Sequence, residues 1–307
     1  MKATKKNPVR ARSARQPQVK SEPKLPFAVQ HQRPPGLESK LRPAPQWAAP
    51  RYRAAGKLEG KVAFITGGDS GIGRSVAFLY AREGADVAIG YLPVEQSDAL
   101  ETQRAIEVLG RQCLLVPADL TRPSACTQSI AKVVKHFGQL DILVSNAAYQ
   151  KHKTLDELTP QELEKTFATN VFACFHLVKA ALPHLKAGSA IIATSSETGI
   201  LGTEKLPDYS STKGALNAFV KTMAMDLIKG GIRVNAVAPG PVWTPLNPSD
   251  QGRTAKETAR FGASSPMGRP AQPEELAPAY VFLASDADSS YITGIVLQVM
   301  GGETSGG

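Results

Sequence analysis

The stretch Lys61-Val-Ala-Phe-Ile-Thr66, followed at once by Gly67-Gly-Asp-Ser-Gly-Ile-Gly73, decides the fold of this chain. Its first half is a short apolar run, which is typical of a strand buried on both faces. Its second half is a glycine-rich turn, and residues 71–83 then predict a helix that ends before Gly84. A strand, a tight turn and a helix in this order predict the first unit of a β-α-β array.

The same alternation continues to the end of the chain. It predicts further strands at 86–91, 113–118, 140–145, 190–194, 232–237 and 294–299, and helices at 95–110, 123–137, 160–186, 208–229 and 273–284. Nearly unbroken apolar strands that alternate with helices are typical of a parallel sheet covered on both faces. We therefore expect an α/β fold, a Rossmann-type doubly wound parallel sheet with helices on both faces, in a single domain.

The N-terminal segment differs from the rest in composition. Residues 1–53 contain 13 Lys and Arg against two acids, a net charge of +11, so the total of +9 leaves −2 for the remaining residues. We divide the chain into a basic, proline-rich arm at 1–55 and a catalytic domain at 56–307. We expect roughly the first 25 residues to be disordered. Residues 34–53, with Leu37, Leu41, Trp47 and Tyr52, are expected to lie over the body or over a neighbouring subunit.

The composition also limits partners and compartment. Because the basicity belongs to the arm, we do not expect nucleic acid as a partner; a solubilising tail is favoured over a weak contact with a polyanion or a membrane surface. No apolar run is long enough to span a bilayer, and no signal peptide is evident. The Arg-rich, acid-poor start leaves an organelle transit peptide open, although its prolines argue against a stable amphipathic helix. The odd, widely spaced Cys113, Cys126 and Cys174 favour a reducing, cytoplasmic location. The five histidines form no cluster with ligand spacing, so we expect no metal.

Two features carry chemistry. The glycine-rich turn lets the backbone approach a pyrophosphate at a helix N-terminus, where free N–H groups favour negative charge. Tyr209 and Lys213 stand four residues apart, which places them on one face if the segment is helical, and Ser196 lies thirteen positions upstream of Tyr209. A positive charge beside a phenol favours the phenolate and lowers the pKa towards the working range. Ser196 is then placed to polarise a substrate oxygen while Tyr209 moves the proton.

In these motifs the chain resembles the short-chain dehydrogenase/reductase family over residues 57–302. The resemblance rests on T-G-x-x-x-G-x-G at 66–73, Asn146-Ala147-Ala148 after the fourth strand, Asn170, Ser196, Tyr209 with Lys213, and Pro239-Gly240 after the sixth strand. More narrowly, residues 67–74, 146–150, 266–269 and the Pro35-Gly-Leu-Glu38 stretch resemble a bacterial subgroup of general-stress oxidoreductases or NADP-dependent aldehyde reductases. One departure is Ser145, where the family usually has another asparagine.

The resemblance implies roles for individual residues. Tyr209 is the general acid/base, Lys213 lowers its pKa and holds the nicotinamide ribose, and Ser196 rather than Ser195 orients the carbonyl. Asn170 interrupts its helix and seats a water that links Lys213 to solvent. The implied cofactor-binding residues are Gly67, Asp69, Ser70, Gly71, Ile72, Gly73, Tyr91, Asp119, Leu120, Asn146, Ala147, Tyr209, Lys213, Pro239, Gly240, Val242 and Thr244. A homotetramer is the usual assembly of the family.

The choice between NAD and NADP depends on charge at the adenosine ribose. An acid at the end of the second strand binds the ribose hydroxyl and repels a 2′-phosphate. Tyr91 occupies roughly that place and Glu95 is the next acid, while Arg74 either offers a positive charge or pairs locally. Position 70, often basic in NADP enzymes, is serine. On balance the sequence favours NADP(H) over NAD(H).

The substrate pocket is expected under residues 244–270. Trp243, Leu246, Phe261 and Met267 either form its apolar walls or pack the lid, and nothing in this stretch specifies a charged substrate. We expect hydride transfer between NAD(P)H and a carbonyl or alcohol, with an aldehyde or ketone reductase favoured. A sugar or polyol dehydrogenase and a 3-oxoacyl-carrier reductase stay open on the same site. A cofactor-sensing binding protein is the alternative of another class.

Overall fold

A computed structural model describes residues 22–304 of the chain. It contains one seven-stranded parallel sheet with the order β3-β2-β1-β4-β5-β6-β7. The strands are β1 (Val62–Thr66), β2 (Asp86–Tyr91), β3 (Cys113–Pro117), β4 (Ile142–Ser145), β5 (Ala190–Thr194), β6 (Arg233–Pro239) and β7 (Val296–Val299). Because β1 has β2 on one side and β4 on the other, the chain reverses its winding there and opens a crevice at the carboxyl ends of the strands. The predicted doubly wound Rossmann-type fold is confirmed.

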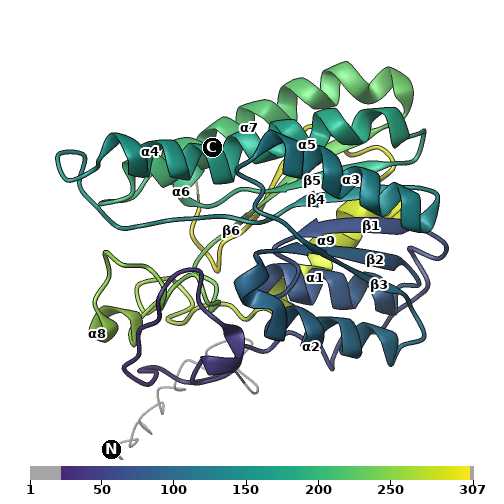
Figure 1. Cartoon of the computed structure of the whole chain (residues 1–307). Coiled ribbons are helices and arrows are strands. Elements are labelled where there is room, and N and C mark those ends of the chain that lie inside the picture. Colours follow the sequence, from purple (N-terminus) through teal and green to yellow (C-terminus); the bar gives the residue numbers. More distant parts are fainter. Residues whose placement is uncertain (1–21, 305–307) are drawn as a thin grey trace, which may run out of the picture.

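Helices cover both faces of the sheet (Figure 1). One layer contains α1 (Gly71–Arg82), α2 (Gln96–Glu107) and α9 (Pro273–Ala284), and the other contains α3 (Pro123–Phe137), α4 (Pro160–Phe167), α5 (Ala173–Ala181) and α7 (Pro207–Leu227). Three short helices, α6 (Thr198–Leu201), α8 (Ala255–Thr258) and α10 (Asp286–Ser289), lie in the connections. None of the helices within residues 22–304 has the length and apolar character needed to cross a membrane.

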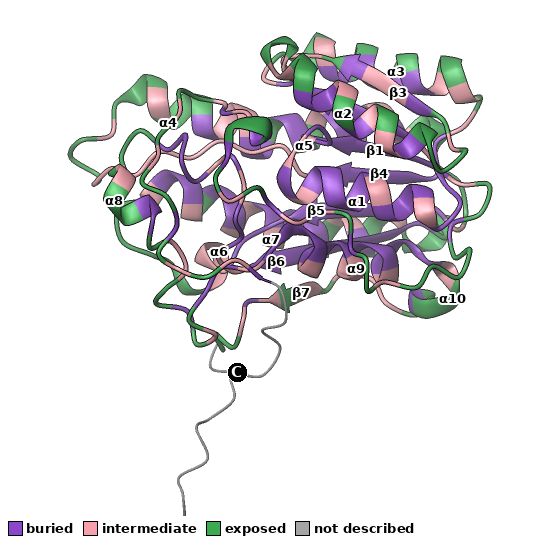
Figure 2. Cartoon of the chain, turned by 90° about the horizontal axis from the view of Figure 1, so that it is seen from below, coloured by how far each residue is buried: buried purple, intermediate pink, exposed green. Residues whose placement is uncertain are grey.

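The strand residues alternate between two apolar cores, as the two-residue period of a strand requires. Ala63 and Ile65 of β1 belong to the core under α1 and α9, whereas Val62 and Phe64 belong to the core under α3, α5 and α7. All four side chains are buried, and Figure 2 shows the strands buried between helices whose outer faces are exposed. This explains the nearly continuous apolar runs in the sequence.

The helix predicted at 160–186 is divided in the structure. It begins as α4, passes through a π-helical turn at Ala168–Phe172, resumes as α5 and ends in a 3₁₀ turn at Leu182–His184. Asn170 lies in the π turn, where it is 3% exposed. The predicted single helix is therefore wrong in detail, while the expected interruption at Asn170 is present.

The described part of the arm, from residue 22 onward, lies against the body of its own chain. In Figure 1 it runs beside the segment that carries α8. Backbone hydrogen bonds join Phe27 N–H to the Ala259 carbonyl and Gln32 N–H to the Pro248 carbonyl, each 2.8 Å long. Of the expected anchors, Leu41 is fully buried, and the Trp47 and Phe78 rings pack edge to face at 5.2 Å. The disorder expected for the first 25 residues falls mainly outside the described residues.

Candidate active site

A cavity of about 690 Å³ lies at the carboxyl ends of the central strands. The sequence-predicted residues that line it are Gly67, Asp69, Ser70, Gly71, Ile72, Tyr91, Asp119, Leu120, Asn146, Ala147, Ser196, Tyr209, Lys213, Pro239, Gly240, Val242 and Thr244. Two predicted residues, Gly73 and Asn170, are not among the residues that line the cavity. Within residues 22–304, no group of three or more His, Cys, Asp or Glu side chains is arranged to hold a metal ion.

The glycine-rich turn has the geometry that a diphosphate requires. Gly71, with φ +51°, starts α1, and the first-turn N–H groups of a helix have no intrahelical acceptor. A Cβ on Gly73 would lie 1.9 Å from the Gly67 carbonyl oxygen, so the helix can approach the strand this closely only without a side chain there. The turn therefore fits the pyrophosphate of a dinucleotide at the α1 N-terminus.

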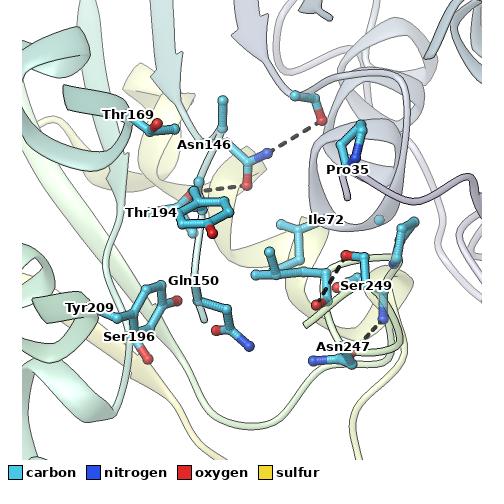
Figure 3. Close-up of a pocket in the computed structure, with 18 of the residues that line it drawn as sticks. Pro35, Ile72, Asn146, Gln150, Thr169, Thr194, Ser196, Tyr209, Asn247 and Ser249 are labelled. Atoms are coloured by element: carbon cyan, nitrogen blue, oxygen red, sulfur yellow. Dashed lines mark hydrogen bonds between the residues drawn. The ribbon is translucent and has the colours of Figure 1, made fainter. Parts of the chain in front are cut away.

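Asn146 joins the ends of three neighbouring strands. Its backbone N–H donates to Thr66 Oγ1 over 2.9 Å, and its Nδ2 donates to the Thr66 carbonyl over 3.0 Å. Its Oδ1 accepts from Thr194 Oγ1 at 3.1 Å. These bonds fix the floor of the cavity beside the glycine-rich turn, as Figure 3 shows for Asn146 and Thr194.

Ser196 follows β5, and Tyr209 and Lys213 lie one turn apart on α7. Figure 3 shows Tyr209 beside Ser196. Lys213 Nζ donates to the Thr194 carbonyl over 2.7 Å and lies 5.3 Å from the centre of the Tyr209 ring. The neighbouring Ser195 instead donates to Asn217 Oδ1 over 2.6 Å. The structure thus brings Ser196, Tyr209 and Lys213 together, as the spacing predicts.

Burial shifts the pKa values of both α7 groups. It raises the pKa of Tyr209 to about 12, and the Ser196 hydroxyl acts in the lowering direction. It lowers the pKa of Lys213 to about 8, because a buried ammonium loses hydration. The expected lowering of the tyrosine pKa is therefore wrong for the protein without cofactor, where desolvation of the phenolate dominates.

Asn170 does not line the cavity, but its side chain bonds to two segments that form the site. Its Oδ1 accepts from Tyr149 N–H at 2.8 Å, and its Nδ2 donates to the Tyr149 carbonyl at 2.9 Å and to Thr212 Oγ1 at 3.1 Å. Both N–H groups of the amide are thus occupied. The side chain fixes the loop after β4 against α7, between Tyr209 and Lys213.

At the end of β2, the cavity is lined by Tyr91 and Glu95. Burial raises the pKa of Glu95 to about 8, with nearby Asp69 adding to the effect. On the adjacent strand end, Asp119 Oδ1 accepts from the backbone and hydroxyl of Thr121 at 3.1 and 2.7 Å. Arg74 does not face this region, so of the two possibilities open in the sequence, the structure supports local pairing.

The four apolar residues at and beside the lid, residues 244–270, divide between the two roles that the sequence left open. Leu246 and Phe261 line the cavity, whereas Trp243 and Met267 do not. Trp243 is fully buried against Phe27 and Leu41 of the arm. Its Nε1 donates to the Pro43 carbonyl over 2.9 Å. Trp243 is therefore buried by the arm and does not form part of the cavity wall.

The sequence alone did not indicate several residues that the structure adds to the cavity wall. They are Pro34 and Pro35 of the arm, Gln150 and His152 after β4, Glu197, and Arg253 in the lid. Burial raises the pKa of Glu197 to about 7. Gln150 and Pro35 lie in stretches that carry the family resemblance, but no motif assigns these six residues to the cavity. Folding of the arm and the lid over the sheet brings them there.

Comparison with known proteins gives the family. Residues 67–304 match the family model described as Enoyl-(Acyl carrier protein) reductase. Uncharacterized oxidoreductase YhdF and General stress protein 39, both from Bacillus subtilis (strain 168), are 53% and 51% identical; the matches cover 89% and 88% of this chain and 94% and 93% of the relatives. NADPH-dependent aldehyde reductase 1, chloroplastic, from Arabidopsis thaliana is 44% identical over 87% of this chain and 94% of that protein.

A solved structure of a short-chain dehydrogenase is also similar to this chain. A short-chain dehydrogenase from Burkholderia cenocepacia J2315 in complex with NADP is similar with a TM-score of 0.73 and 33% identity, covering 80% of this chain and 98% of that one. The fold and site define a Rossmann-type oxidoreductase that acts on carbonyl or alcohol groups with a nicotinamide cofactor. The chain belongs to the short-chain dehydrogenase/reductase family.

The relatives also share part of the arm. Residues 56–307 are 252 of the 307 residues, or 82% of the chain, so matches that cover 89% and 88% extend into the arm. The solved structure, which covers 80% of this chain, is similar to less of it.

Proposed function

We propose that the protein reduces a small aldehyde or ketone with NADPH. The observation that carries this proposal is the convergence of Ser196, Tyr209 and Lys213 in the cavity that begins at the glycine-rich turn. A pure binding protein has no need of a buried phenol beside a buried ammonium. The preference for NADP(H) is supported by the NADPH-dependent plant relative and by the NADP complex of the similar structure.

Each residue has a distinct part in the proposed reaction. The cofactor supplies the hydride when it is bound. Ser196 donates a hydrogen bond to the carbonyl oxygen and orients it, and Tyr209 transfers its proton to that oxygen as the carbonyl carbon is reduced. Lys213, aimed by its bond to the Thr194 carbonyl, binds the nicotinamide ribose and stabilises the phenolate that remains.

Asn170 is proposed to complete the proton path to solvent. Both amide N–H groups of Asn170 are occupied by bonds to other residues. The water that links Lys213 to solvent is therefore proposed to bind the main-chain carbonyl of the π turn. The cavity-lining residues that the sequence assigns to the cofactor, from Gly67 to Thr244, are proposed to hold it. Gly73 contributes by allowing the close approach of α1 to the turn.

We further propose a cytoplasmic homotetramer that associates through the outer faces of α5 and α7. Large apolar side chains are exposed on and beside these helices: Phe172 at 49%, Phe175 at 47%, Met225 at 72% and Ile228 at 55%. Exposed apolar patches of this kind mark association surfaces. The division into an arm at 1–55 and a catalytic domain at 56–307 is also a proposal, supported by the start of β1 at Val62.

The test is the rate of NADPH oxidation with a panel of aldehydes and ketones, compared with NADH and with Tyr209→Phe. Turnover that falls by about 10²–10⁴-fold in the variant, with NADPH binding retained, supports a reductase. The reverse reaction with polyols and the reduction of 3-oxoacyl thioesters test the two other substrate classes. Tight NADPH binding without turnover on any substrate would instead support the sensor.

A further inference from the structure

Arg253 is a cationic side chain of the lid that lines the cavity and has no part in the chemistry described above. We propose that Arg253 binds an anionic group of the substrate, a carboxylate or a phosphate, so that the carbonyl substrate is a negatively charged aldehyde or ketone. This inference rests on the proposed reductase function, and it adds to it the chemical class of the substrate.

Contacts hold the guanidinium of Arg253 in place but occupy only some of its N–H groups. Its Nη2 lies 2.9 Å from His152 Nε2, and its Cζ lies 5.1 Å from the centre of the Phe261 ring. Among residues 22–304, no carboxylate lies within ion-pair distance of it. A guanidinium has five N–H donors in a planar fork, so further donors are available to a ligand in the cavity.

The tautomer of His152 follows from its two partners. Arginine can only donate, so His152 Nε2 must accept, and the ring proton is then on Nδ1. Nδ1 lies 2.5 Å from Asp250 Oδ2 and donates to it. His152 is therefore a neutral link between Asp250 and Arg253, and it acts as a positioning residue for the guanidinium.

Asp250 does not neutralise Arg253 directly. Its side chain is fully buried, and its two oxygens accept four hydrogen bonds. Besides His152 Nδ1, the donors are His152 N–H, Gly252 N–H and Gln150 Nε2, each at 3.0 Å. Burial acts to raise the pKa of Asp250, but these bonds lower it overall, so the carboxylate stays charged and saturated.

The cluster lies at the substrate end of the cavity. Figure 3 shows Gln150 next to Tyr209 and Ser196, and Gln150 is one of the donors to Asp250. His152 follows two residues further along the same loop. A Cβ on Gly252 would lie 1.8 Å from the His152 carbonyl oxygen, so the lid closes tightly on this loop. Arg253 is therefore held over the loop after β4.

Partial burial makes the guanidinium a strong anion site. Burial lowers the pKa of Arg253, although a guanidinium stays protonated in proteins. Charge-assisted bidentate bonds to a carboxylate or phosphate are roughly twice as strong as neutral hydrogen bonds. Lys165, which also lines the cavity and packs 4.0 Å from the Tyr149 ring centre, adds a second positive charge to the same wall.

The experiment compares substrates that differ only by the anion. NADPH-dependent kcat/KM is measured for 4-oxobutanoate against butanal, and for glyceraldehyde 3-phosphate against glyceraldehyde, with the native protein, Arg253→Gln and the control Arg260→Gln. Arg260 is an exposed arginine of the same lid that does not line the cavity. We expect the anion-to-neutral ratio to fall by about 10–100-fold in Arg253→Gln, mainly through KM, and to be unchanged in the control. The pair that shows the fall identifies carboxylate or phosphate.

A second measurement needs no substitution. Butanoate and inorganic phosphate should inhibit butanal reduction by the native protein competitively with butanal, and Arg253→Gln should lose this inhibition. Equal losses on charged and neutral substrates, or weakened NADPH binding in Arg253→Gln with no change in the ratio, would overturn the inference. Absence of turnover in the native protein with all four substrates, anionic and neutral, would instead count against the proposed reductase function itself.

Discussion

Glu38 and Arg74 form a buried ion pair that joins the N-terminal arm to helix α1. Oε1 and Nη1 are 2.9 Å apart, and the side chains are 3% and 1% exposed. The other carboxylate oxygen accepts the Gly71 N–H at 2.5 Å, at the very start of α1. The arm therefore takes part in shaping the glycine-rich turn. Through Glu38, the arm also pairs with the guanidinium of Arg74. Arg74 additionally donates to the carbonyls of Asp69 and Asp98.

The first prediction concerns Glu38→Gln and the pH dependence of stability. Burial raises the pKa of Glu38 from 4.5 to about 7, although Arg74 and the Gly71 N–H act in the lowering direction. An acid with a raised pKa in the folded state stabilises the fold below pH 4.5, and this contribution is lost as the pH rises through about 7. Relative to the variant, the native protein should lose up to about 3 kcal/mol of unfolding free energy between these limits.

Urea unfolding of both proteins at pH 5, 6, 7 and 8 measures this difference. Other titrating groups are common to both chains, so they largely cancel when the two curves are subtracted. Parallel stability curves over the whole range would show that Glu38 has an ordinary pKa in the folded protein.

The second prediction concerns the anchor of the arm on the lid. Trp243 is fully buried, its ring lies 4.6 Å from that of Phe27, and it donates to the Pro43 carbonyl. Trp243→Ala should cost about 3–5 kcal/mol of stability, and Trp243→Phe should cost less because much of the packing remains. Trypsin cleavage after the exposed Lys40 should accelerate in the same order.

A matched control is Tyr291→Ala, which removes an aromatic ring that is fully exposed. It should change neither the melting temperature nor the cleavage rate. Unchanged cleavage in Trp243→Ala would mean that other contacts hold the arm.

The third prediction tests the close approach at the glycine-rich turn. An alanine at position 73 would place its Cβ 1.9 Å from the Gly67 carbonyl oxygen, so the turn must move. We expect Gly73→Ala to lower the melting temperature and to weaken NADPH binding at least tenfold, which is about 1.4 kcal/mol. NADPH fluorescence titration and thermal unfolding measure the two effects.

Gly214→Ala is the control, because the nearest atom to its Cβ would be an ordinary 3.6 Å away within α7. Alanine in a helix interior is favoured over glycine, so this variant should gain up to about 1 kcal/mol in stability. Similar losses in both variants would contradict the steric argument.

The fold could be predicted from the sequence because the apolar runs and glycine-rich punctuation are local signals. The division of the helix at 160–186 could not, because it depends on distant partners. Asn170 bonds to Tyr149 and to Thr212, which are 21 and 42 residues away in the chain. The spacing of apolar residues within the helix itself gives no sign of these contacts.

The candidate site was predictable only where its residues form contiguous motifs. Ser196, Tyr209 and Lys213 were found by spacing, but Asp250 and Arg253 meet His152 from 98 and 101 residues away. For Trp243 the sequence left open whether it forms a wall of the pocket or packs the lid. Its actual neighbours are Phe27 and the backbone of Pro43, about 200 residues earlier in the chain.

The last prediction concerns the pH dependence of the proposed reaction. Lys213 has a pKa lowered to about 8 by burial, whereas Tyr209, with a pKa of about 12, stays protonated throughout the neutral range. If the charged Lys213 holds the cofactor ribose, kcat/KM for NADPH should be constant below about pH 7 and should fall roughly tenfold per pH unit above about 8. Lys213→Arg keeps its charge, so its profile should lack this fall although its absolute rate is lower.

Glu95 is the competing origin of such a fall, because burial raises its pKa to about 8 and it lines the same cavity. Ionisation of Glu95 above this pH would repel the phosphates of the cofactor, which also lowers kcat/KM. The two origins separate in the profiles of Lys213→Arg and Glu95→Gln. Loss of the fall in Glu95→Gln, with its persistence in Lys213→Arg, would assign the titration to Glu95 and would contradict the role given to Lys213.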